Sequence, residues 1–196
     1  TTLFRSNTGR VNLDTIVQIK EVIDLLIVAR PRTSIDEKTK FKIDQYIMNG
    51  GKVLWLIDKL AVSLDSLRRP GNAYVPYDYT LNIDDQLFKY GARIQSNLIL
   101  DMECSKIPLQ TGMMGKTPQY DQFPWFYYPL ITPKSNHPIV KSLDRVNLYF
   151  PSSIDTIQTK TAVHKEILLS SSKYTRLQPN TSRLNFEVLR YDAEPE

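Results

Sequence analysis

The stretch DLLIVARPRTSIDEKTKFKIDQYIMNGGKVLWLID, residues 24–58, decides the predicted fold. It begins with one continuous apolar run, residues 24–31, and ends with a second, residues 52–58. Such runs are typical of strands that are buried on both faces of a parallel sheet. Between them, apolar residues from Ile35 to Ile47 recur at partly helical spacing. The order strand, helix, strand with a short return predicts a right-handed parallel crossover.

Two glycines, Gly50 and Gly51, stand between the predicted helix and the second strand. Phosphate-binding glycines lie after a strand and before a helix, where free amides point at the anion. Here the order is the reverse, so we expect Gly50 to end the helix in the left-handed conformation. At the other end, Thr33 or Ser34 is expected to cap the helix.

The same kind of unit is expected to recur further along the chain. A helical stripe ends at Gly91, and NLILD, residues 97–101, is expected to form another strand. From residue 105 onwards, prolines and aromatic residues replace the helical spacing, which indicates strands broken by turns. We therefore predict an α/β fold with a mainly parallel sheet flanked by helices in residues 1–104, a β-rich part in residues 105–177 and a polar tail in residues 178–196.

Composition limits the class of protein. The 196 residues are 41% hydrophobic and 23% charged, which is ordinary for a globular domain. The single cysteine excludes an internal disulfide framework. The net charge is +4 and the basic residues are dispersed, so nucleic acid is not an expected partner. No apolar run could span a membrane, and the start has neither a Met nor a signal-peptide centre. We therefore expect a soluble part of a longer protein.

One candidate site lies where the first predicted strand ends. Ligands of open parallel sheets bind beyond the carboxyl ends of the strands. Those ends would present Arg30, Arg32, Thr33 and Ser34, and two arginines beside a helix amino terminus favour an anion. The alternative is that Thr33 or Ser34 only caps the helix while the arginines are solvated. Both interpretations stay open for these four candidate ligand- or partner-binding residues.

A second candidate surface is an aromatic group that consists of Tyr120, Phe123, Trp125, Phe126, Tyr127 and Tyr128. In a strand, successive side chains point to opposite faces, so about half of these rings would face outward. Outward Trp or Tyr side chains favour contact with a protein or a sugar, whereas inward ones fill a core. Trp125 and Tyr127 are our contact candidates in this segment.

Catalysis by Cys104 is an alternative function. This residue follows a predicted strand, as the nucleophile of an amidotransferase-like enzyme would. Its context DMECSKIP has no neighbouring glycine and no helical pattern after it, and only His137 or His164 could act as an imidazole base. The chain shows no spaced set of metal ligands. We therefore expect no catalytic residue, no metal and no cofactor.

Several blocks of the chain resemble the GldG family, the gliding-associated ABC transporter auxiliary proteins of Bacteroidetes bacteria. The blocks include DLLIVARP, KFKIDQYIMNGGKVLWLID, LNIDDQLFKYGARI, NLILDMECSKIPL, PWFYYPL and NHPIVKSLD. The resemblance runs from about Val11 to the stretch ILLSSSKYTR, which is nearly the whole chain. The resemblance implies a flavodoxin-like or class I glutamine amidotransferase-like core that is not known as an enzyme. It also implies a periplasmic domain, anchored in the inner membrane by transmembrane helices outside this sequence. Its partners would be the permease and ATPase subunits of the transporter.

The predicted function is that of a non-catalytic periplasmic accessory domain of a gliding-motility-associated ABC transport system. Such a domain would act by binding a protein or a ligand. The two alternatives are a cysteine-dependent hydrolase or amidotransferase-like enzyme that uses Cys104, and a receptor for a small anion or sugar at Arg30 and Arg32.

Overall fold

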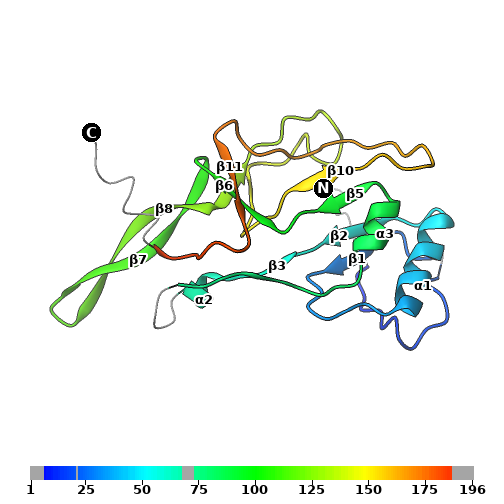
Figure 1. The fold of residues 1–196 in the computed structure, drawn as a ribbon, viewed down its shortest axis with the longest axis horizontal. Helices are drawn as coiled ribbons and strands as arrows, with labels where there is room; N and C mark the ends of the chain where they lie inside the picture. The colour runs from blue at the N-terminus through cyan, green and yellow to red at the C-terminus, as the bar shows by residue number, and fades with distance from the viewer. Residues whose placement is uncertain (1–6, 21, 68–72, 187–196) are drawn as a thin grey trace. The chain divides into compact units, whose positions relative to one another are not determined.

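The computed structural model describes residues 7–20, 22–67 and 73–186 (Figure 1). The chain divides into two compact units. Unit 1 contains Thr1–Ile57 and Thr80–Gln86, and unit 2 contains Asp58–Tyr79 and Leu87–Glu196. The domain boundaries predicted after residues 104 and 177 stay predictions.

Unit 1 contains the predicted strand, helix and strand. Strand β1 (Leu26–Ala29) pairs in parallel with β2 (Val53–Leu56), and α1 (Glu37–Met48) connects them. Leu26 lies opposite Val53 in this register. The parallel crossover is therefore confirmed. Its core is a cluster of apolar side chains from the N-terminal segment, β1 and α1, namely Ile19, Leu26, Ile43 and Tyr46.

The apolar runs had predicted that β1 and β2 are buried on both faces. In the structure each strand is buried on one face only. Leu26 and Val28 pack on the side of α1, whereas Ile27 between them is 53% exposed. Leu54 and Leu56 of β2 are exposed as well. The burial therefore alternates as in a strand with one covered face, because α1 lies against only one side of the pair.

Helix α1 begins later in the sequence than predicted. Its N-cap is Asp36, in an extended conformation, and the carboxylate accepts a hydrogen bond from Thr39 N–H at 3.0 Å. The expectation that Thr33 or Ser34 caps the helix is therefore wrong. Asp36 is an equally good cap, and it stands closer to the apolar positions that α1 buries.

Residues 80–86 are held to α1 by a lysine whose side chain is largely buried. Lys40 Nζ lies 2.8 Å from Asp85 Oδ1 and 3.0 Å from Glu37 Oε1. The hydrogen bond to Asp85 is the main cause of the raised pKa of Lys40, so the lysine carries its charge at neutral pH. Main-chain Ile35 N–H also donates to the Leu81 carbonyl at 2.9 Å.

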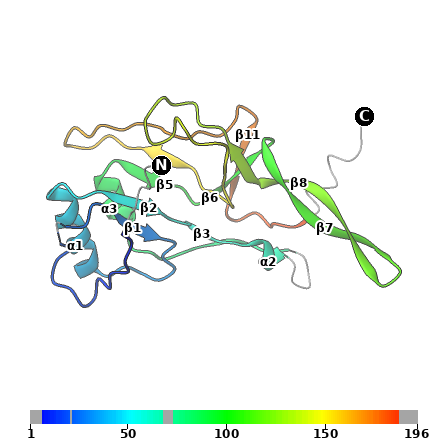
Figure 2. The ribbon, with the colours of Figure 1, turned by 180° about the vertical axis from the view of Figure 1, so that it is seen from behind.

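Unit 2 is built from short antiparallel sheets, which Figures 1 and 2 show from opposite sides. Its only helix lying wholly within the described part of the unit is α2 (Leu64–Leu67), while α3 (Asp84–Lys89) crosses the division between the units. The strand pairs are β3 (Leu60–Ala61) with β4 (Tyr77–Asp78), β5 (Ala92–Ile94) with β10 (Ile154–Thr156), β6 (Asn97–Asp101) with β11 (Thr175–Pro179), and β7 (Cys104–Met114) with β8 (Thr117–Ile131), which also pairs with β9 (Val146–Asn147).

The predicted fold class is wrong. Among the described residues β1–β2 is the only parallel pair, and the remaining sheets are antiparallel, so the sheet is not flavodoxin-like or amidotransferase-like. A parallel sheet needs a long crossover, usually a helix, between successive strands. Helix α3 has six residues, too few to cover a sheet, and β6 pairs instead with β11 from the end of the chain.

The core of unit 2 includes the half of the β7–β8 hairpin that is further from its turn. Trp125 and Tyr127 of β8 are 0% exposed, with ring centroids 5.1 Å apart. Phe150 and Phe186 pack against Trp125. The other buried members of this cluster are Leu60, Leu67, Leu98, Leu100, Ile107 and Leu184.

Candidate functional site

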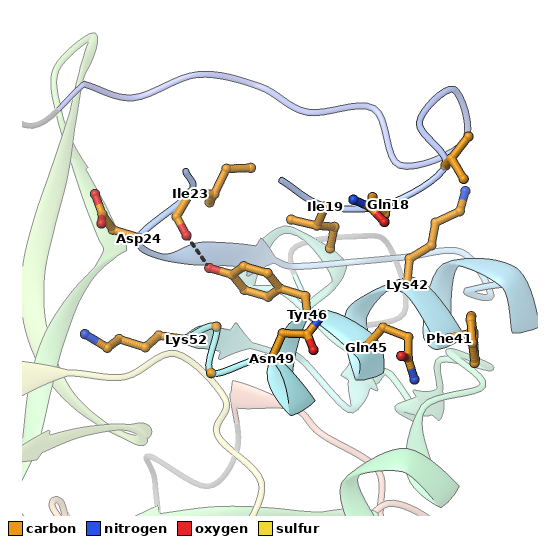
Figure 3. Close-up of a pocket in the computed structure, with 13 residues that line it drawn as sticks. Gln18, Ile19, Ile23, Asp24, Phe41, Lys42, Gln45, Tyr46, Asn49 and Lys52 are labelled. Carbon is orange, nitrogen blue, oxygen red and sulfur yellow. Dashed lines mark hydrogen bonds between the residues drawn. The ribbon is translucent and has the colours of Figure 1, made fainter. Parts of the chain in front are cut away.

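Unit 1 contains a cavity of about 490 Å³ beside α1 (Figure 3). Its walls are α1, the turn between α1 and β2, and the segment that precedes β1. We call the described residues of that segment, 12–20 and 22–24, the strap. The lining residues are Val17, Gln18, Ile19, Ile23, Asp24, Phe41, Lys42, Gln45, Tyr46, Asn49, Gly50, Gly51 and Lys52.

The strap is tied to α1 at two points. Lys42 Nζ donates to the Leu13 carbonyl at 2.7 Å, and Tyr46 Oη donates to the Ile23 carbonyl at 2.6 Å. Both donors come from the helix face that turns toward the strap, one helical turn apart. The strap makes no strand pairing with its neighbours in the described residues, so the space between these two ties stays open.

The turn after α1 forms the third wall, and its two glycines have different roles. Gly50 has φ of 89°, and its N–H bonds to Ile47 O while Gly51 N–H bonds to Tyr46 O, both at 2.9 Å. This is the Schellman ending, and it confirms the left-handed conformation predicted for Gly50. A Cβ added to Gly51 would lie 2.4 Å from the Tyr46 ring. Gly51 therefore leaves room for the ring that forms the cavity floor.

Two lining residues of opposite charge, Asp24 and Lys52, stand at one end of the cavity (Figure 3). Asp24 lies two residues before β1, and Lys52 directly precedes β2. The Lys52 carbonyl accepts a hydrogen bond from Leu26 N–H at 2.9 Å. Neither side chain makes an ion pair or hydrogen bond within the described residues. The side-chain amides of Gln18, Gln45 and Asn49 also lack a partner in that part of the chain. The lining thus combines apolar side chains with free polar groups, as small-molecule sites do.

The predicted anion site at Arg30, Arg32, Thr33 and Ser34 lies at the other end of the strands, after β1. All four residues are exposed. Asp36 occupies the amino terminus of α1 and places a carboxylate where an anion would bind. Arg30 has φ of 47° although Pro31 follows it, which is a strained conformation for that position. The structure therefore groups these residues on one exposed loop, and their role in binding stays a prediction.

The aromatic contact candidates Trp125 and Tyr127 lie in the core of unit 2 rather than on its surface. Tyr127 Oη donates to Gln178 Oε1 at 2.7 Å, which ties β8 to β11. Burial raises the pKa of Tyr127, so the phenol stays protonated and donates this bond. In this conformation both rings stabilise the base of the β7–β8 hairpin.

The far half of that hairpin is an exposed arm, residues 110–122, of which only Gly112 is partly covered. Met114 pairs with Thr117 across a two-residue turn in which Gly115 has φ of 64°, as a II′ hairpin turn requires. Figures 1 and 2 show β7 and β8 extending away from β6 and β11. No other described strand pairs with the arm.

One face of the arm is free of charge. Pro118, Tyr120 and Gln122 alternate along β8 and therefore point to the same side. Their cross-strand partners Met113, Gln110 and Pro108 share that side. We call these six residues the arm face, which includes Pro108 two residues before the arm itself. Tyr120 is 57% exposed and Met113 60%, and Met114 beside the turn is 76% exposed.

Cys104 does not sit at a strand-to-helix elbow. It begins β7 and is followed by ten more strand residues. Burial raises the pKa of the Cys104 thiol, which disfavours the thiolate that a nucleophile needs. His137 Nδ1 accepts a hydrogen bond from Ile139 N–H at 3.2 Å, so that nitrogen is engaged locally. These contacts give no support to a Cys104–His137 dyad.

The described residues contain no group of side chains suited to a metal ion and no candidate membrane-spanning helix. Among those described, no three His, Cys, Asp or Glu side chains lie together as a metal site would require. Within the same ranges, no helix combines the length and apolar character needed to cross a membrane.

Sequence reasoning missed both the cavity and the arm. The cavity could have been approached from the parallel pair, because parallel strands start at the same sheet end and bring Asp24 near Lys52. The arm had a signal in Gly115–Lys116, a two-residue loop of the Gly-X type.

Comparison with known proteins adds the family. A family model described as "ABC-type uncharacterized transport system" matches residues 5–196. No curated protein and no solved structure matches the chain. The match covers both units, and it places the protein in the family of auxiliary components of ABC-type transport systems.

Proposed function

We propose that the chain is a non-catalytic accessory module which binds another subunit of its ABC transport system through the arm. The observation that carries the proposal is the exposed, uncharged arm face next to Met114. Family membership supplies the context, because an auxiliary component works with the other components of a transporter.

The composition of the arm face fits a protein interface. The buried centres of such interfaces are depleted in Lys, Glu and Asp and enriched in Tyr and Met. The arm face contains a Tyr, a Met, two prolines and two glutamines. Methionine side chains adapt their shape to a partner, and a projecting Tyr supplies a rigid anchor. A two-stranded ribbon that is exposed on both sides is only marginally stable alone, so a partner would also order it.

The outer edges of the arm are not suited to strand addition. Pro108 of β7 and Pro118 of β8 lack an N–H group, and a proline fits an antiparallel ladder only where that group would face away from the partner strand. The prolines therefore remove donors from the free edges and protect them from unspecific pairing. Binding through side chains of the arm face is the mode that remains.

The partner is proposed to be the permease or the ATPase subunit, and the location to be the periplasm, as the resemblance to GldG implies. That resemblance also supports a role in a gliding-associated system. In this proposal, Trp125 and Tyr127 act as positioning residues, because their rings anchor the base of the hairpin that carries the arm. Arg30, Arg32, Thr33 and Ser34 are a secondary candidate surface in unit 1.

Site-specific photo-crosslinking in native membranes tests the proposal. A photoreactive residue replaces Met114 or Tyr120 in the full-length protein, and a matched control replaces Ile167, which is 70% exposed in unit 2 outside the arm. We expect the arm positions to crosslink to the permease or ATPase subunit and the control position not to. Arm positions that yield no adduct with a transporter subunit, in membranes that contain the assembled system, would refute the proposal.

A matched pair of charge variants gives a second readout. Tyr120→Asp places a charge on the arm face, whereas Ile167→Asp places the same charge elsewhere on unit 2. Both side chains are exposed, so neither change should alter folding. The proposal requires co-purification of transporter subunits to fall with Tyr120→Asp and to persist with Ile167→Asp.

A further inference from the structure

We propose that the cavity of unit 1 binds a free α-amino acid, with the zwitterionic head group between Asp24 and Lys52 and the side chain along the cavity. This site is separate from the arm, so the two proposals stand or fall independently. Its support comes from the size, the rigidity and the charge arrangement of the cavity.

The size and construction of the cavity suit a small ligand. A volume of about 490 Å³ lies in the range of small-molecule sites. The strap is tied to α1 through Lys42 and Tyr46, and Tyr46 is itself buried. The walls therefore exist before a ligand arrives, which reduces the entropy lost on binding.

The charges decide the kind of head group. Parallel pairing brings the starts of β1 and β2 to one end of the sheet, and Figure 3 shows Asp24 and Lys52 at the same end of the cavity. They do not form an ion pair with each other. An ammonium beside Asp24 and a carboxylate beside Lys52 would satisfy both. An α-amino acid carries these two groups on one carbon, whereas the termini of a peptide are further apart.

The remainder of the lining suits an extended side chain. Ile19 and the Tyr46 ring form an apolar floor, and Figure 3 shows Phe41 at the end away from Asp24 and Lys52. Lys42 at that end is engaged by the Leu13 carbonyl. The amides of Gln45 and Asn49 stand on the α1 side and can each donate and accept a hydrogen bond. A simple anion would meet the Asp24 carboxylate as well as Lys52, and a simple cation would meet the Lys52 ammonium as well as Asp24, so a ligand with one charge is disfavoured.

An NMR titration of the full chain with L-leucine tests the proposal. We expect the backbone amides of Asn49, Gly50 and Gly51 and the side-chain amide of Gln45 to shift as L-leucine rises to about 20 mM, a range that detects weak binding. Two analogues separate the charges: 3-methylbutylamine lacks the carboxylate, and 4-methylpentanoate lacks the ammonium. Each should bind more weakly by about two- to fivefold, because each loses one solvent-exposed ion pair.

Variants locate the two contacts. Asp24→Asn and Lys52→Met should each weaken L-leucine by about two- to fivefold, and Lys38→Met, an exposed lysine of α1 outside the lining, should not. Each variant alters an exposed side chain, so a dispersed spectrum like that of the parent shows that the fold is kept. No shift of the cavity amides, equal binding of the single-charge analogues, or unchanged binding by both variants would each overturn the proposal. Loss of arm crosslinks with intact L-leucine binding would refute only the proposed function.

Discussion

Asp101 offers the sharpest test of how unit 2 is held together. The carboxylate is 2% exposed at the end of β6. Oδ1 accepts from Glu103 N–H at 2.9 Å and from the Ser172 hydroxyl at 2.5 Å. Oδ2 accepts from Ser172 N–H at 2.7 Å and from the Thr175 hydroxyl at 2.9 Å. One side chain thus fixes the start of β11 to the end of β6.

Asp101→Asn keeps the shape of the side chain but replaces one acceptor oxygen by an NH₂ group. Whichever way the amide turns, one main-chain N–H, that of Glu103 or that of Ser172, then faces the NH₂ group, and the remaining bonds go to a neutral acceptor in place of a charged one. Hydrogen bonds to a charged group contribute about 1.5–3 kcal/mol each, so we expect a loss of about 3–5 kcal/mol in the free energy of unfolding. Asp121→Asn is the matched control, because that carboxylate is exposed and has one bond, to Thr111. It should cost less than about 1 kcal/mol.

Urea denaturation followed by fluorescence measures this difference. The chain has two tryptophans, Trp55 in β2 and Trp125 in the core of unit 2. In a Trp55→Phe background, Trp125 alone reports on unit 2. A loss below about 1 kcal/mol for Asp101→Asn would refute the argument that the carboxylate holds β6 and β11 together.

The same residue gives a pH dependence. Burial alone would raise the pKa of the Asp101 carboxyl, but the donors from Ser172, Glu103 and Thr175 outweigh it and lower the pKa below the ordinary value. The folded state therefore binds this proton less readily than the unfolded state does. The stabilisation is complete above the unfolded pKa of about 3.9 and is lost as pH falls through the lower folded pKa. Asp101→Asn should remove this component of acid unfolding.

Three further predictions concern other parts of the chain. Gly51→Ala should destabilise unit 1 by about 1–3 kcal/mol in urea denaturation, because the new Cβ would lie 2.4 Å from the Tyr46 ring; a neutral result would mean that the ring is free to move. Tyr127→Phe should cost about 1 kcal/mol through loss of the 2.7 Å bond to Gln178, and an unchanged midpoint would show that this bond contributes nothing. Cys104 should react with a disulfide reagent at neutral pH more slowly than free cysteine, because burial raises the pKa of its thiol; faster reaction would revive the enzyme hypothesis.

The helix of unit 1 could be predicted because its signals are local. Apolar spacing, an acidic cap and Gly50 all act within a few residues, and the short return leaves a parallel crossover as the only economical connection. The exact cap could not be chosen, because Thr33, Ser34 and Asp36 are all good caps. The choice of Asp36 as the cap depends on how α1 packs against β1. That packing cannot be predicted from the three cap candidates themselves.

The partners of the later strands could not be predicted in the same way. NLILD was correctly expected to be a strand, but its apolar pattern is compatible with a parallel neighbour or an antiparallel one. The structure pairs it with Thr175–Pro179, and the buried Asp101 at its end supplies the specific lock. Asp101 was the available sign in the sequence, because a buried carboxylate at the end of an apolar strand needs hydrogen-bond donors from a neighbouring segment. Ser172 and Thr175 supply them.

The prolines of β8 explain why this segment was expected to form strands broken by turns. The spacing of the same prolines also indicates that β8 is continuous. Pro118 and Pro124 are an even number of residues apart, so both can place the missing N–H on the same free edge. Pro129 is an odd number away, which would put its nitrogen toward β7. The irregular pairing between Cys104 and Lys106 shifts the register, and Leu130 N–H, not residue 129, donates to Glu103 O at 2.8 Å. The bulge therefore turns the Pro129 nitrogen away from β7, toward the side on which Leu148 N–H donates to the Pro129 carbonyl at 3.1 Å. Proline parity together with one bulge would have allowed a single 15-residue strand.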